Sequence, residues 1–134
     1  LCAQGFGLDH PIEFKLEQMQ HTGSFKARGA FNTLLTQAVP EAGLVAASGG
    51  NHGAAVAYAA RQLGHPAHIF VPEIAGASKI ALIRDIGAAL TVVPGAYANA
   101  MEMAQAHEAR TAAMQIHAYD ADLTVAGQGT CLRE

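Results

Sequence analysis

The stretch LVAASGGNHGAAVAYAARQLG, residues 44–64, contains the three parts of a parallel-sheet unit. Its apolar start, Leu44 to Ala47, predicts a short buried strand, and its alanine-rich end, Gly53 to Leu63, predicts a helix. A loop of glycine and polar residues joins the two, and Gly64 stands where the helix ends. A strand followed by a crossover helix is the repeating unit of a parallel sheet.

The same alternation continues along the chain, with glycine and proline at the junctions. Further strands are predicted at His68–Val71, Leu90–Val93 and Met114–Ile116, and further helices at Ser78–Ile86 and Tyr97–Arg110. Apolar strands joined by helices form sheets that are covered on both faces. We therefore predict an α/β fold with a doubly wound parallel sheet over residues 43–119.

The flanking segments look like pieces of another domain. Residues Ile12 to Glu17 alternate apolar and charged side chains, which predicts a half-buried strand. After a polar turn, Ser24 is expected to cap a helix with one apolar stripe. Because the chain begins at Leu1 without a methionine and stops at Glu134 inside a predicted new helix, we expect a piece of a longer protein.

Composition excludes several classes of function. The chain has 134 residues, 51% hydrophobic and 14% charged, which indicates a globular protein. With a net charge of −3 and only eight lysines and arginines, it has no basic stripe for nucleic acid. No apolar stretch approaches the roughly 20 residues that span a membrane. Two cysteines without a metal-ligand spacing, and histidines without paired acids, favour a cytoplasmic protein with no metal site.

The loop SGGNHG, residues 48–53, is the first candidate binding site. Parallel sheets bind ligands beyond the carboxyl ends of their strands, and free N–H groups at a helix start attract an anion. Two alternatives remain open. The glycines can serve only a tight turn that Ser48 or Asn51 caps, or the loop can be a dinucleotide-binding fingerprint that lacks its first glycine, with Glu73 after the next strand.

Lys26 is the second candidate, because it lies in the first turn of a predicted helix and off its apolar stripe. The positive end of the helix dipole and burial both disfavour the ammonium form, and only a neutral amine attacks a carbonyl. The position therefore suits Schiff-base chemistry, and Gly29 is expected to leave room for a flat group beside the helix. The alternative is an ordinary solvated surface lysine.

Three motifs together resemble the serine/threonine dehydratase family, pyridoxal-phosphate enzymes of the tryptophan-synthase-β-like fold, also called fold type II. They are KLEQMQHTGSFKARGA at residues 15–30, ASGGNHG at 47–53 and AGQGT at 126–130. The resemblance implies that Lys26 carries pyridoxal 5'-phosphate and moves the substrate's α-proton. It also implies that Phe25 packs against the cofactor ring and Asn51 bonds its phenolic oxygen. The loop residues expected at the substrate carboxylate are Ser48, Gly49, Gly50, Asn51 and His52.

The implied reaction is α,β-elimination on a serine- or threonine-like hydroxy amino acid, giving a 2-oxo acid and ammonia. Racemases of the family place a serine where Gly49 stands, so elimination is favoured over racemisation. The resemblance implies residues 1–42 as part of the large cofactor domain, 43–119 as the small domain, and 120–134 as the return to the large one. It further implies a homodimer, and a chain too incomplete to hold the cofactor tightly by itself. The alternatives are a Rossmann-like nucleotide-binding domain, a serine racemase, or a structural piece that only associates with the rest of the protein.

Overall fold

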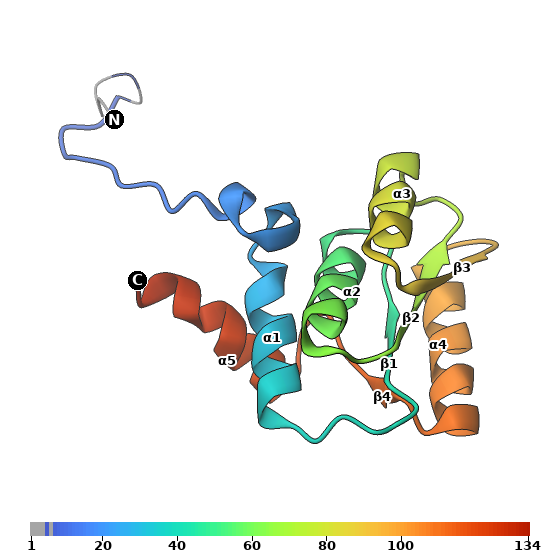
Figure 1. Ribbon diagram of the computed structural model, residues 1–134. Helices are drawn as coiled ribbons and strands as arrows, with labels where there is room; N and C mark the ends of the chain where they lie inside the picture. The colour runs from blue at the N-terminus through green and yellow to red at the C-terminus, as the bar shows by residue number, and fades with distance from the viewer. Residues whose placement is uncertain (1–4, 6) are drawn as a thin grey trace.

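The computed structural model describes Gly5 and residues 7–134 (Figure 1). Four strands alternate with helices over most of the chain. The strands are β1 (Leu44–Ala47), β2 (Ala67–Pro72), β3 (Ala89–Val93) and β4 (Met114–Gln115). The helices are α1 (Lys26–Thr36), α2 (Asn51–Leu63), α3 (Ala77–Ile86), α4 (Tyr97–Thr111) and α5 (Asp122–Gly129). Short 3-10 helices lie at Glu17–Met19, His21–Gly23 and Thr130–Leu132.

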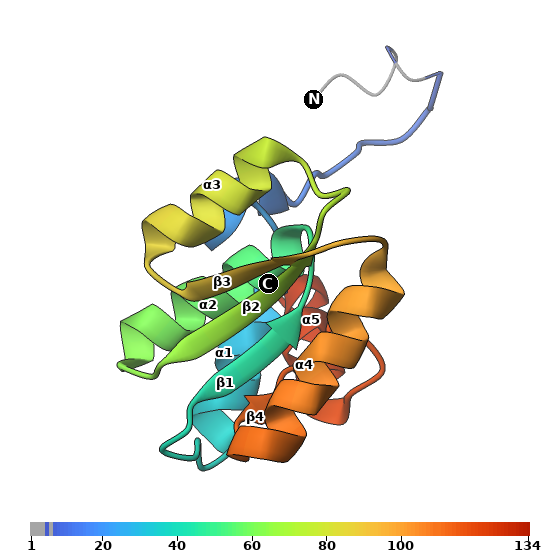
Figure 2. The same ribbon diagram turned by 90° about the vertical axis from the view of Figure 1, so that its right-hand side faces the viewer.

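The four strands form one parallel sheet in the order β3-β2-β1-β4 (Figure 2). The chain first steps outward from β1 to β2 and β3, and then crosses back so that β4 pairs with the other side of β1. The direction of winding therefore reverses between β1 and β4. Beyond the carboxyl ends of these two strands lies the crevice in which open α/β sheets bind ligands.

Helices cover both faces of the sheet, which confirms the predicted doubly wound α/β fold. On one face, α1, α2 and α3 close a core around Leu44, Ile69 and Ile83. On the other face, Ala100 and Ala104 of α4 pack against Val45 and other sheet residues. Most of α2 is buried because it lies between the sheet and α1 and α3 (Figure 1), and its alanines permit this close approach.

The predicted strand at Ile12–Glu17 is wrong. Residues 11–16 belong to neither helix nor strand, and Glu17 begins a 3-10 helix. Alternation of side chains makes a strand only where a neighbouring strand accepts its backbone hydrogen bonds. Within the described residues, the sheet contains only β1 to β4, so this segment has no strand to pair with.

The helix cap predicted at Ser24 is also wrong. Ser24 makes no cap hydrogen bond at the start of α1, and its side chain is instead buried. At the other end of the chain, α5 ends at Gly129, which directly precedes the 3-10 helix Thr130–Leu132 without a side-chain cap hydrogen bond. The Thr130 hydroxyl donates back to the Gly127 carbonyl at 2.8 Å, the usual way for a threonine to satisfy a free carbonyl near a helix end.

Helices α1 and α5 cross at two glycines. A Cβ on Gly29 would lie 2.8 Å from the Thr124 carbonyl oxygen, and one on Gly127 would lie 2.6 Å from the Arg28 carbonyl oxygen. The space expected beside Gly29 is therefore filled by α5, which corrects the sequence prediction. Helix α1 also contributes Ala27, Ala30 and Leu34 to the core that it shares with α2. The division into domains stays a prediction.

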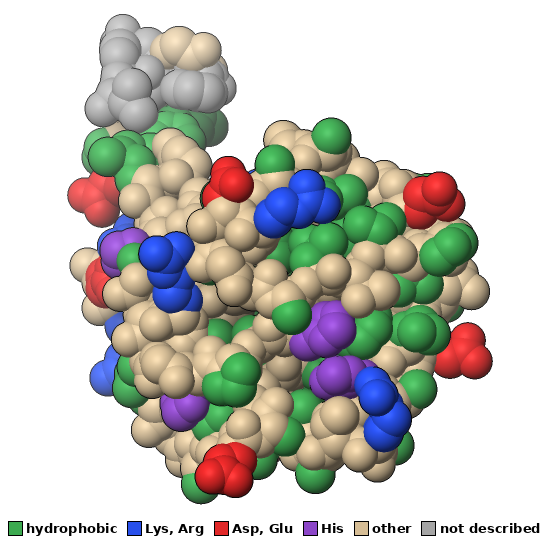
Figure 3. All heavy atoms as spheres, turned by 45° about the vertical axis from the view of Figure 1, so that its right-hand side comes forward, with side chains coloured by type: hydrophobic (Ala, Val, Ile, Leu, Met, Phe, Trp, Pro, Cys, Tyr) green, Lys and Arg blue, Asp and Glu red, His purple; other side chains and the backbone are tan. Residues whose placement is uncertain are grey.

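Charged side chains are scattered over the face shown in Figure 3, without a continuous positive band. Among Gly5 and residues 7–134, no helix has the length and apolar character needed to cross a membrane. The same part of the chain contains no group of three or more histidine, cysteine, aspartate or glutamate residues arranged to hold a metal.

Candidate active site

The loop between β1 and α2 is held in place by its own polar groups. The Ser48 backbone N–H donates to the Phe70 carbonyl at 3.0 Å, which continues the sheet pairing by one step. The buried Ser48 hydroxyl accepts the Gly50 N–H at 3.2 Å. This hydroxyl is thus already engaged in shaping the loop, as serine hydroxyls often are in turns.

The two adjacent glycines of the loop differ in the space around their Cβ positions. A Cβ on Gly49 would stand 2.7 Å from the Ala75 Cβ and 3.2 Å from the Pro72 ring. Gly50 has open space on its Cβ side, with nothing within 4 Å. Gly49 therefore lets the loop lie against the segment after β2, while Gly50 leaves a ligand free to approach the backbone.

The first turn of α2 is available for an anion. Gly50 precedes the helix, and no side chain caps it. The N–H groups of an uncapped first turn carry partial positive charge and need hydrogen-bond acceptors. Asn51, the first residue of α2, is exposed, so its amide can reach a ligand at this edge of the sheet. The helix therefore starts two residues earlier than predicted, so Asn51, His52 and Gly53 lie in the first turn of α2 and only Ser48, Gly49 and Gly50 form the loop.

The His52 side chain points into the protein and not toward a ligand at the sheet edge. It is 5% exposed, and its Nε2 lies 2.9 Å from the Ile116 carbonyl oxygen. Burial lowers the pKa of His52 to about 4, so the ring is neutral at pH 7 and Nε2–H donates to that carbonyl. The imidazole therefore ties the start of α2 to the end of β4, and the group of His52 left for a ligand is its backbone N–H.

The Lys26 amine lies at the same edge of the sheet. Its Nζ donates to the Ala118 carbonyl at 2.5 Å, just after β4, and lies 5.1 Å from the centre of the Phe25 ring. Partial burial lowers the pKa of Lys26 below its ordinary value. The positive charge of Lys26 also contributes to the lowered pKa of His52. Lys26 is therefore not a freely solvated lysine.

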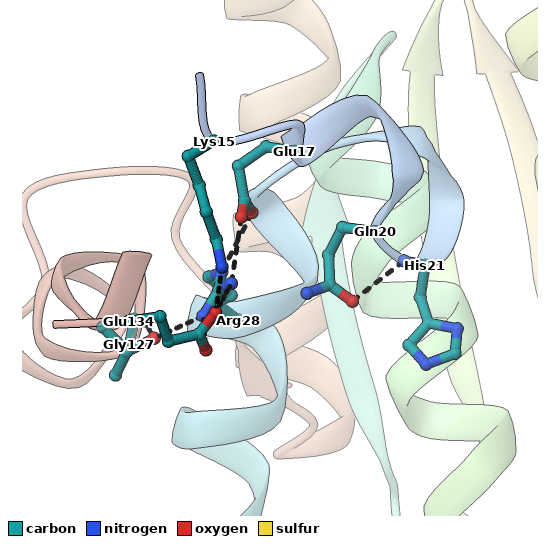
Figure 4. A network of polar contacts seen from close by, with 8 residues as sticks. Lys15, Glu17, Gln20, His21, Arg28, Gly127 and Glu134 are labelled. Carbon is teal, nitrogen blue, oxygen red and sulfur yellow. Dashed lines mark hydrogen bonds and ion pairs between the residues drawn. The ribbon is translucent and has the colours of Figure 1, made fainter. Parts of the chain in front are cut away.

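Arg28, in the first turn of α1, is the centre of a network of charged and polar side chains (Figure 4). Its guanidinium makes two hydrogen bonds of 2.9 Å to Glu17, two of 2.7 and 2.9 Å to Glu134, and one of 2.9 Å to Thr130. Lys15 also contacts Glu134. Arg28 and Lys15 lower the pKa of Glu134 to about 2, so its charge persists at ordinary pH. The network joins the segment before Lys26 to the end of the described chain.

Sequence reasoning missed the Ala118 carbonyl and the Arg28 network. The first carried no sequence signal because its acceptor is a backbone atom. The second had a partial signal in two acidic residues and one arginine, but nothing in their spacing indicates that Glu17 and Glu134 meet. Near Lys26 lie two further groups without partners in the described chain, the buried hydroxyls of Thr22 and Ser24.

Comparison with known proteins identifies the family and the fold. Residues 3–134 match the model of a family described as pyridoxal-phosphate dependent enzyme. An L-threonine ammonia-lyase of Thermotoga maritima is 40% identical over 89% of this chain and 30% of its own length. An L-threo-3-hydroxyaspartate ammonia-lyase of a Pseudomonas species is 39% identical over 92% of this chain and 39% of its own. The structure of maize serine racemase has a TM-score of 0.82 and 35% identity, covering 86% of this chain and 36% of that one.

The chain spans about a third of the length of the curated relatives that it matches. The family match nevertheless covers nearly all of the chain, including Lys26 and the loop after β1. The similarity to the fold of maize serine racemase is consistent with this family match, and so is the position of Lys26 at the edge of the sheet. The chain belongs to the family of pyridoxal-phosphate-dependent enzymes.

Proposed function

We propose that the full-length protein is a pyridoxal-phosphate-dependent ammonia-lyase that removes water from a serine- or threonine-like hydroxy amino acid. The products are a 2-oxo acid and ammonia. The observation that carries the proposal is the Lys26 amine, which is partly buried, has a lowered pKa and lies at the carboxyl edge of the sheet. The 40% identity to an L-threonine ammonia-lyase supports the reaction class.

Each site residue then has a separate task. Lys26 holds the cofactor and moves the proton at the substrate Cα, for which a neutral amine is required. Phe25 packs beside the cofactor and Asn51 hydrogen-bonds it, while the segment from Ser48 to His52 binds the substrate carboxylate through those of its N–H groups that have no partner in the sheet or the loop. When bound, pyridoxal phosphate would supply an electron sink, which accepts the electron pair that stays on Cα after the proton has left.

The residues present fit such a cofactor. The hydroxyls of Thr22 and Ser24 are buried without a hydrogen-bond partner in the described chain, and both lie shortly before Lys26. A buried hydroxyl without a partner is unfavourable by about 1–3 kcal/mol. A polar group bound next to Lys26 would satisfy them, whereas a purely structural role for this segment leaves them unexplained. The open Cβ side of Gly50 provides room at the loop.

Serine racemisation is the second candidate, because maize serine racemase is among the similar structures. Gly49 argues against it. The resemblance places a serine at this position in racemases, and a side chain here would begin 2.7 Å from the Ala75 Cβ. The loop would have to move before a serine hydroxyl could face the substrate. We also propose, from the resemblance and the cysteine pattern, a homodimer in the cytoplasm.

The decisive experiment is reduction of the cofactor onto the protein. Full-length protein mixed with pyridoxal phosphate should develop a visible absorbance band, and borohydride should fix the cofactor on the peptide that contains Lys26. Lys26→Ala should abolish both signals, while Lys79→Ala, on helix α3, should change neither. Labelling of another lysine, or equal labelling of the Lys26→Ala protein, would contradict the assignment.

Product analysis then separates the two reactions. L-threonine should yield 2-oxobutanoate and ammonia in equal amounts, without accumulation of a second stereoisomer of the substrate. Formation of the other stereoisomer without the 2-oxo acid would instead support the racemase.

A further inference from the structure

A cavity of about 240 Å³ lies at the segment after β4 to which the Lys26 amine donates its hydrogen bond. Its wall includes Ala118, the residue whose carbonyl accepts the Lys26 hydrogen bond. The first residue of α4 and the segment after β4 form the rest of it. The lining residues are Tyr97, Met101, His117, Ala118, Tyr119 and Asp120.

We propose that this cavity receives the substrate side chain and selects an uncharged hydroxyl side chain over one that carries a second carboxylate. The inference rests on the proposed function. If Lys26 acts on the Cα proton and the loop after β1 holds the α-carboxylate, these two substituents of Cα already have their binding partners, and the side chain needs a third place. The cavity includes Ala118, which accepts the Lys26 hydrogen bond, and none of the residues 48–52 lines it, so we assign it to the side chain.

The polar groups of the cavity suit a hydroxyl. Tyr97 is 37% exposed and Tyr119 is 64% exposed, so both rings border the cavity without being closed off from a ligand. Burial and the neighbouring Tyr119 raise the pKa of Tyr97, so it stays a neutral phenol at ordinary pH. A phenol both donates and accepts a hydrogen bond, as does the hydroxyl of serine or threonine.

The charges of the cavity oppose a second carboxylate. Asp120 lies on the wall, and none of the lining residues is a lysine or an arginine. Sites that recognise carboxylates in proteins usually present an arginine or a helix start. Here a substrate side-chain carboxylate would instead meet the Asp120 carboxylate, and like charges in one site reject a ligand. Of the two kinds of ammonia-lyase relative, the cavity fits the one that acts on threonine.

The test compares L-threonine with L-threo-3-hydroxyaspartate on the full-length protein. The ratio of kcat/KM should favour threonine by about tenfold or more, a selectivity that pockets of this kind reach. Tyr119→Arg should reduce the ratio by about tenfold by raising kcat/KM for hydroxyaspartate, and Asp120→Asn should reduce it by a smaller factor. Asp122→Asn is the matched control, because Asp122 is exposed and does not line the cavity.

Binding without turnover gives an independent measurement. In the Lys26→Ala protein, calorimetric titration should show weaker binding of hydroxyaspartate than of threonine, and Tyr119→Arg should reverse the order. Equal kcat/KM values, or a ratio that neither cavity variant changes, would overturn the cavity assignment while the proposed reaction stands. Absence of cofactor on Lys26 together with absence of turnover would overturn both.

Discussion

Replacing Gly127 by alanine tests how closely α1 and α5 must approach to hold Lys26 in place. The new Cβ would lie 2.6 Å from the Arg28 carbonyl oxygen, 2.6 Å from the Asn32 Cβ and 2.8 Å from the Gly29 Cα. None of these atoms is the free end of a flexible side chain, so the two helices have to separate. Overpacking of this kind destabilises a protein by about 1–3 kcal/mol, and three rigid contacts place this change near the upper value.

Alanine also favours a helix over glycine by about 1 kcal/mol, which offsets part of that loss. We therefore expect Gly127→Ala to lower the free energy of unfolding of the full-length protein by about 2 kcal/mol. Gly129→Ala is the matched control, because Gly129 ends the same helix at φ −61° with nothing within 4 Å of its Cβ position. It should be neutral or stabilising. Urea unfolding measures both, and a Gly127→Ala protein as stable as the control would refute the reasoning.

Three further predictions concern the site and its supports. The pKa of His52 is about 4 in the folded protein and 6.5 in a model peptide, so the unfolded chain binds a proton first as the pH drops. The free energy of unfolding should therefore fall between pH 6.5 and pH 4. Urea unfolding at several pH values should show a smaller fall for His52→Gln. Gly49→Ser should lower kcat/KM for elimination at least about tenfold without producing a racemase, and an added Ala75→Gly should restore part of it; wild-type rates for the single variant would contradict the contact. Arg28→Gln should lower the thermal midpoint of unfolding clearly, whereas the exposed Arg133→Gln should not; equal shifts would mean that the Arg28 hydrogen bonds add no stability.

The sheet and its crossover helices were predictable because their signals are local. Leu44 to Ala47 is both apolar in sequence and buried in the structure, and Gly64 ends α2 in the left-handed conformation that glycine adopts easily. Alternation at Ile12–Glu17 failed because a strand depends on a partner elsewhere, which a local pattern does not contain. The prediction of open space beside Gly29 was wrong for a similar reason, since its neighbour in space comes from α5.

The candidate site was predictable only in part. Lys26 and the segment from Ser48 to His52 carry specific motifs, and the structure brings them to one edge of the sheet. Their roles toward cofactor and substrate stay predictions. The sequence did not show that the His52 ring turns inward to the Ile116 carbonyl, because a backbone acceptor leaves no trace in residue identity.

The hydrogen bond from Lys26 to Ala118 joins residues that are 92 positions apart. During synthesis, the lysine therefore leaves the ribosome long before its acceptor exists. The hydrogen bond can form only after the segment that follows β4 has reached the sheet, where β4 pairs with β1.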